Sequence, residues 1–206
     1  PPPSETADAV GPGSPHRLPP ERVRRTIAIV VDDLRSNEAA RSTREAIRRF
    51  VDDRMEPGDL IAIVQARAGA GALQQFSADR EVLHATIDRI RYTPRSRPER
   101  DCEEAPSSER ALDEALRTDI FVRGTLGVLN FVVRGLRELP GRKSVVLMSD
   151  GIPCALDVPD AKETGASRVR AAMLNLVDLA NRSAVAIYSI DVRGVETLSI
   201  GSPAAA

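Results

Sequence analysis

Cysteine, histidine and lysine are scarce in this chain of 206 residues. Two cysteines and two histidines, one of them at His16 in a proline-rich segment, are too few for the usual four-ligand structural zinc site. The lysines are Lys143 and Lys162, against 27 arginines, so a catalytic amine that must lose its proton has few sources. This scarcity argues against enzymes that use a Schiff base or a lysine base.

Several longer patterns are also missing from the sequence. No apolar run approaches the roughly 20 residues that a membrane-spanning helix needs. The net charge of −1 gives no reason to expect nucleic acid or an anionic membrane as a partner. No nucleophile elbow, phosphate-binding loop or His-Glu-x-x-His motif is present, so we expect no enzymatic activity. The chain starts without Met and without an apolar signal segment, which predicts a piece of a longer protein.

Proline is concentrated at the start, where seven of the 15 prolines fall in the first 20 residues. Such a stretch has little to bury and favours extended backbone, so we interpret residues 1–24 as a linker. Residues 25–193 are predicted to form one domain, with a polar insertion at 91–108. Residues 194–206 are then a tail or the truncated end of that domain.

Short β-branched runs alternate with stretches of helical spacing across this predicted domain. Three runs predict buried strands, at 26–31, 60–66 and 144–148, and a further strand is predicted at 184–190. A weaker run at Leu73–Phe76 predicts an antiparallel edge strand. Apolar spacing predicts helices at 38–55, 79–90, 109–139 (with a break at Gly124) and around 169–180. The alternation predicts an α/β fold with a mostly parallel sheet and helices on both faces.

Acidic residues follow three of the predicted strands. Asp32, Asp150 and Asp191 would meet at one edge of the sheet, because parallel strands end at the same edge. A single carboxylate in such a place is most often a helix cap or the partner of an arginine. Where several converge, a hard divalent cation becomes an alternative, since such cations take oxygen ligands.

Three segments in this order, VVDDLRS, RGTLGVL and VVLMSDG, resemble a von Willebrand factor A domain. Two longer segments, FVVRGLRELPGRKSVVLMSDG and AVAIYSIDVRG, further resemble the bacterial VWFA-related subgroup. The resemblance implies a Rossmann-like three-layer α/β/α fold, with one antiparallel edge strand in the sheet. It also implies a metal-ion-dependent adhesion site for Mg²⁺, Ca²⁺ or Mn²⁺. Residue by residue, the ligands would be Asp32, Ser36, Thr125 and Asp150. The sequence departs from the family pattern at Leu34, where the family has a serine ligand.

Each of these positions also has an ordinary structural explanation. Ser36 or Asn37 can cap the helix that follows, Thr125 can pack inside a helix, and Asp150 can cap the turn at Gly151. The sequence by itself leaves both interpretations open.

The resemblance further implies a non-enzymatic binding or adhesion module whose cation accepts an acidic group of a protein partner. A metal-free protein-interaction or scaffold domain is the alternative. A receiver-like phospho-acceptor domain is a remote one, because Lys143 precedes its strand instead of following it. The resemblance also implies export to the periplasm, the cell surface or the exterior.

The two cysteines fall in loops that we expect above the same edge of the sheet. Cys102 lies in the insertion, and Cys154 follows Asp150 closely. In a cytosolic protein both would be free thiols, whereas export favours a Cys102–Cys154 disulfide. In the chain-entropy description the bridge would stabilise the fold by about 3–4 kcal/mol.

Overall fold

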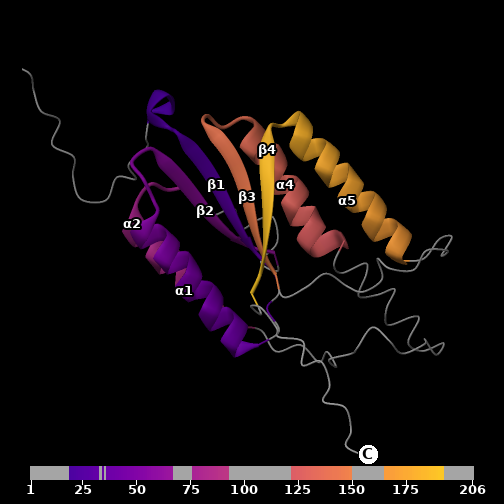
Figure 1. The fold of residues 1–206 in the computed structure, drawn as a ribbon, viewed down its shortest axis with the longest axis horizontal. Coiled ribbons are helices and arrows are strands. Elements are labelled where there is room, and N and C mark those ends of the chain that lie inside the picture. The colour runs from indigo at the N-terminus through magenta and orange to yellow at the C-terminus, as the bar shows by residue number, and fades with distance from the viewer. Residues whose placement is uncertain are drawn as a thin grey trace, which may run out of the picture.

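The computed structural model describes residues 19–32, 34, 36–66, 76–92, 122–149 and 165–192, which form a sheet with helices on both faces (Figure 1). The strands are β1 (Arg25–Val31), β2 (Asp59–Gln65), β3 (Arg142–Ser149) and β4 (Val185–Asp191). The α-helices are α1 (Asn37–Asp53), α2 (Arg80–Ile87), α4 (Gly127–Arg137) and α5 (Gly165–Arg182). A 3-10 turn, η1 (Pro20–Arg22), precedes β1, and a π-helical turn, η4 (Val122–Leu126), precedes α4.

The sheet has the order β2-β1-β3-β4, and every neighbouring pair is parallel. The chain therefore moves from β1 to one side for β2 and crosses to the other side of β1 for β3. Crossovers in such sheets share one hand, so this reversal puts the later helices on the opposite face. The predicted α/β fold with a parallel sheet is confirmed, and it is compatible with a Rossmann-like architecture. The reversal also makes the boundary between β1 and β3 the switch point of the sheet.

The predicted antiparallel edge strand at Leu73–Phe76 is not seen in the part of the chain that the structure describes, which begins again at Phe76. What remains of the pairing is one isolated antiparallel bridge between Ile61 and Ser77, whose two N–H···O bonds are each 2.9 Å long. On the side toward α2 the pairing stops because Asp79, two residues later, is already the N-cap of that helix. The chain leaves the sheet to start that helix.

Alternate residues of the central strands enter two separate hydrophobic cores. On one face Ile29 and Ile63 pack with Ile47 of α1 and Ile87 of α2. On the other face the neighbouring strand residues pack against α4 and α5; these are Ala28, Val30, Val64, Val145 and Leu147. Burial on both faces explains why the strands are unbroken apolar runs instead of alternating ones.

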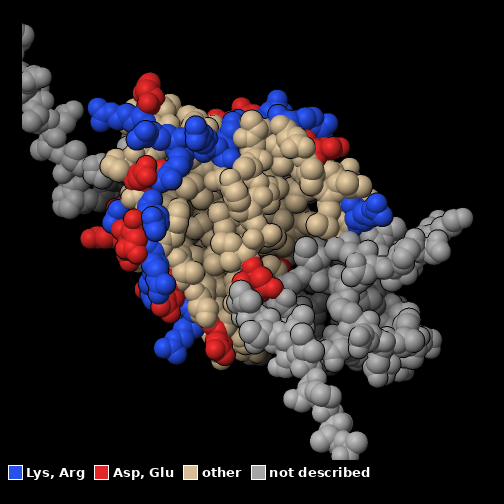
Figure 2. Space-filling view, in the orientation of Figure 1, with Lys and Arg blue, Asp and Glu red and all other residues tan. Residues whose placement is uncertain are grey.

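The outer strand β4 is covered on one face more than on the other. Val185 is buried and packs with the α5 layer, whereas Tyr188 and Ile190 are 59% and 47% exposed. Charged side chains of both signs gather over α1 and α2, and the part of the surface over β3 and β4 is mostly uncharged (Figure 2). Among the described residues no helix is both long and apolar enough to cross a membrane.

The predicted domain limits fall partly outside the described residues. The last part of the proposed linker forms η1, and Val23 after it is buried. Residues 1–18, the insertion beyond Tyr92, and residues 193–206 lie outside the described part. Asp150, Cys102 and Cys154 do as well, so the predicted ligand role of Asp150 and the disulfide stay predictions.

Candidate metal centre

Asp32 is the first residue after β1 and sits at the switch point of the sheet. Its backbone N–H donates to the carbonyl oxygen of Met148 in β3, at 2.9 Å. This bond continues the pairing of β1 with β3 one residue past the end of β1. The main chain at Asp32 is therefore fixed against β3, and its half-buried side chain starts from a fixed position.

Thr125 contacts Asp32 from the turn that precedes α4. It lies in the π-helical turn η4, and its side chain is buried, at 4% exposure. The Thr125 hydroxyl donates a short hydrogen bond to Oδ1 of Asp32. π-Helical turns are rare, and they occur often at functional sites, where they change which side chains face inward. Here the turn directs a hydroxyl into the switch point.

Ser149 is the third member of the group and was not predicted from the sequence. It ends β3, it is buried at 8% exposure, and its hydroxyl donates to Oδ2 of Asp32 at 2.9 Å. The two carboxylate oxygens of Asp32 therefore each accept a hydrogen bond from a different element. The available sequence signal was a hydroxyl at the end of an apolar strand. Its significance depends on β3 lying next to β1.

Ser36, the third of the predicted ligands that the structure describes, is the N-cap of α1. Its Oγ accepts a hydrogen bond of 3.0 Å from the backbone N–H of Ala39. Leu34 turns away from solvent and packs in the core under α1. The structural explanation for Ser36 is thus confirmed as its local role, and the structure brings Asp32 and Thr125 into direct contact.

The acidic residue that ends β4 lies at the same edge, as expected. Asp191 is paired in register with Ser149, and the N–H of Val192 donates to the carbonyl oxygen of Ser149 at 3.0 Å. Asp191 is exposed, in contrast to Ser149 and Thr125. The prediction that strand-end acids gather at one edge holds for Asp32 and Asp191, the two that the structure describes.

We call Asp32, Thr125 and Ser149 the switch-point triad. Its side chains offer only oxygen atoms as metal ligands. One carboxylate and two hydroxyls suit hard cations such as Mg²⁺, Ca²⁺ or Mn²⁺ and do not suit zinc or copper. Within the described ranges no three His, Cys, Asp or Glu side chains come together as a candidate metal cluster. The triad is not of that type, because two of its members are hydroxyls.

No protein-family model matches the chain, and no curated protein sequence matches it.

Proposed function

We propose that this protein is a non-enzymatic binding module with a divalent-cation site at the switch point of its sheet, of the von Willebrand factor A type. The cation would be Mg²⁺, Ca²⁺ or Mn²⁺, with Asp32, Ser36, Thr125 and Asp150 as its proposed ligands. When bound, it would offer an open coordination position to a carboxylate of a protein partner. Export of the protein belongs to the same proposal.

The observation that supports this proposal most is that two hydroxyls donate hydrogen bonds to the Asp32 carboxylate. Thr125 and Ser149 come from different elements and converge on one carboxylate at the switch point. A hydroxyl that donates its hydrogen to a carboxylate keeps its lone pairs for a cation. Thr125 and Asp32 can therefore face a hard cation together, while the backbone bond from Asp32 to Met148 keeps the carboxylate in place.

Metal titration tests this proposal directly. We expect millimolar Mg²⁺ or Mn²⁺ to raise the melting temperature of the wild-type protein. At a concentration 100 times the dissociation constant, the gain is about 2.7 kcal/mol. Asp32→Asn should abolish the shift. Asp53→Asn, at the exposed end of α1, is the matched control and should keep the shift.

Two results would count against the cation site. The first is a wild-type melting temperature that does not change with either ion. The second is a shift of equal size in Asp32→Asn, which would place the bound ion elsewhere on the protein.

A metal-free interaction domain is the second candidate function, and one observation favours it. Both carboxylate oxygens of Asp32 already accept hydrogen bonds within the chain, so the fold does not need a cation to compensate this carboxylate. A chelator distinguishes the two candidates, because only the cation-dependent module loses its melting shift when EDTA is added.

The receiver-like alternative fits the geometry less well. Lys143 is paired with Thr26 near the start of β1, at the edge of the sheet opposite Asp32. A phospho-acceptor site needs its lysine beside the acidic residues, and this one lies a whole strand length away.

A further inference from the structure

The switch-point triad contains one residue that the cation proposal above does not use. Ser149 was not among the proposed ligands, yet its hydroxyl holds Oδ2 of Asp32 at 2.9 Å. Building on the proposed cation site, we propose that Ser149 is a positioning residue. It orients the Asp32 carboxylate for the cation, at a site where position 34 supplies no hydroxyl.

The structure shows why position 34 supplies no hydroxyl to the site. Leu34 is 6% exposed and packs among the residues beneath α1, so this side chain faces the apolar core. It has no oxygen to offer on the β1 side of the site. The hydroxyl of Ser149 contacts the Asp32 carboxylate from the neighbouring strand β3.

The position of Ser149 is fixed more firmly than a loop residue would be. It pairs in register with Asp191 of β4, and its carbonyl oxygen accepts from the N–H of Val192 at 3.0 Å. On the other side, the residue before it accepts the backbone N–H of Asp32. Because Ser149 is also buried, its hydroxyl has a restricted set of positions.

A fixed donor of this kind limits the rotation of the carboxylate. With Thr125 on Oδ1 and Ser149 on Oδ2, the plane of the Asp32 carboxylate is defined from two directions. Groups that hold a metal ligand in its binding orientation typically change metal affinity 10- to 100-fold when they are removed. Ser149 should therefore affect the affinity for the cation without contacting it.

The test measures Mn²⁺ affinity by electron paramagnetic resonance in the full chain, with wild type, Ser149→Ala and Ser149→Thr. We expect Ser149→Ala to weaken Mn²⁺ binding about 10-fold or more, whereas Ser149→Thr, which keeps the hydroxyl, should retain most of the affinity. Ser144→Ala is the matched control, because it removes a hydroxyl near the other end of the same strand. Its affinity should equal that of wild type.

A second measurement separates positioning from simple stabilisation. Each variant is melted in EDTA, and a merely structural role would lower this melting temperature while leaving the Mn²⁺ affinity unchanged. Should Ser149→Ala be insoluble, Ser149→Cys keeps the volume of the side chain and weakens the donor. It is then read in the same way.

The possible results are distinct. If the wild type binds Mn²⁺ and Ser149→Ala binds it equally well, the role of Ser149 is refuted and the cation site stands. Equal loss in Ser149→Thr and Ser149→Ala also refutes it, because the hydroxyl would then be irrelevant. If the wild type binds no Mn²⁺ at all, the cation site itself fails, together with this inference.

Discussion

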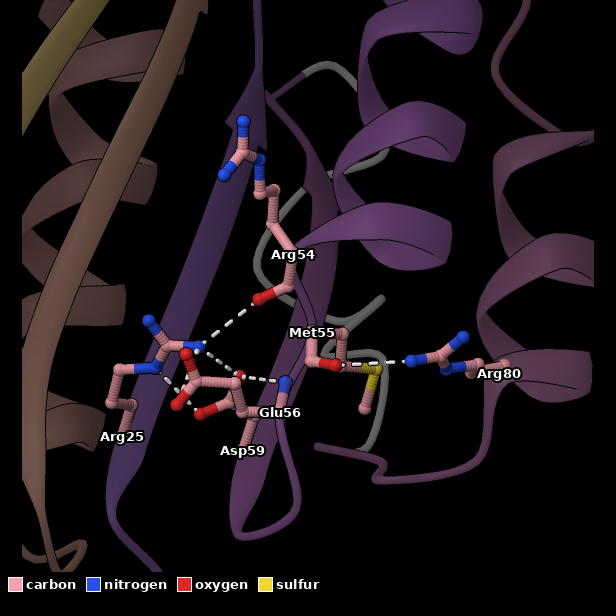
Figure 3. A network of polar contacts seen from close by, with 6 residues as sticks. All are labelled: Arg25, Arg54, Met55, Glu56, Asp59 and Arg80. Atoms are coloured by element: carbon pink, nitrogen blue, oxygen red, sulfur yellow. Dashed lines mark hydrogen bonds and ion pairs between the residues drawn. The ribbon is translucent and has the colours of Figure 1, made fainter.

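Two carboxylates beside the sheet, Asp32 and Asp59, lie at opposite edges and have different kinds of partner. Asp59, 1% exposed, accepts from Nε of Arg25 at 2.7 Å and from Nη2 at 2.5 Å (Figure 3). It also accepts from the backbone N–H of Glu56 at 2.8 Å. A full positive charge thus compensates Asp59, and two neutral hydroxyls are among the partners of Asp32. We assign a structural role to Asp59 on this basis.

Removing the guanidinium of Arg25 should lower the stability of the fold. Arg25→Ala leaves the buried Asp59 carboxylate without its cation, and breaking a buried pair in this way costs about 3–5 kcal/mol. We expect the lower end of this range, because the Arg25 side chain is 35% exposed and water can partly replace it. Urea denaturation at neutral pH measures the loss.

Arg49→Ala is the control for this prediction. Its partner Glu45 is one turn away on the surface of α1, and both side chains are well exposed, so the change should cost less than about 0.5 kcal/mol. Equal losses in the two variants would contradict the role given to Asp59. The hydrogen bonds that Arg25 donates to the Asp59 carboxylate raise the pKa of Arg25. A raised pKa stabilises the fold at every pH below the unfolded value, so this contribution disappears only in strongly alkaline solution.

At the scale of elements, the turns into β2 and β3 depend on glycine. Gly58 and Gly141 have φ angles of +93° and +79°, a region that residues with a Cβ rarely adopt. A Cβ on Gly58 would lie 2.6 Å from the carbonyl oxygen of Arg22, and one on Gly141 would lie 2.8 Å from that of Arg24. Both turns therefore pack directly against the backbone that leads into β1.

Alanine at either turn should destabilise the protein. We expect Gly58→Ala and Gly141→Ala each to lower the free energy of unfolding by more than about 1–2 kcal/mol, since left-handed strain adds to the contact with backbone. Gly135→Ala, inside α4 with open space around it, should instead raise stability by about 0.5–1 kcal/mol. Chemical denaturation of the three variants compares them, and a stabilised Gly141→Ala would show that the turn can relax.

The bounds of strands and helices could be predicted well where burial of side chains determines them. They were predicted poorly where backbone hydrogen bonds determine them. The strand predicted at 26–31 is β1 (Arg25–Val31), because a run buried on both faces has an unmistakable composition. The helix predicted at 79–90 ends already at Ile87, yet Ile90 is still buried. Apolar spacing continued past the last helical hydrogen bonds. A π-helical turn, such as the one at Thr125, changes the spacing in a way that the pattern does not reveal.

The candidate site shows the same division. Strand-end acids at one edge could be foreseen, because all parallel strands end there. Ser149 could not be, since its contact with Asp32 requires β3 to be the neighbour of β1, and the sequence does not give the order of strands. Ser36 had two explanations; the structure confirms its role as the cap of α1, and its role as a cation ligand stays a prediction.

At the scale of the whole molecule, the two edges of the sheet differ in their polar contacts. Arginines make the polar contacts at the amino edge, where the strands begin. Arg25 binds Asp59 there, and Arg80 donates to the carbonyl oxygen of Met55 at 3.0 Å (Figure 3). Figure 2 shows basic side chains along the same edge. The carboxyl edge holds Asp32 and its two hydroxyl partners. An ion pair thus supports the fold at the amino edge, and the proposed cation site lies at the opposite edge.

This separation predicts that the two edges are energetically independent. A strand of seven residues separates them by roughly 20 Å, and substitutions that far apart without shared partners add within about 0.5 kcal/mol. The stability loss of the double variant Arg25→Ala/Ser149→Ala, measured in EDTA, should therefore equal the sum of the two single losses. Arg25→Ala should also leave the Mn²⁺ affinity of the folded protein unchanged. A coupling above about 1 kcal/mol would mean that the sheet transmits strain from its amino edge to Asp32.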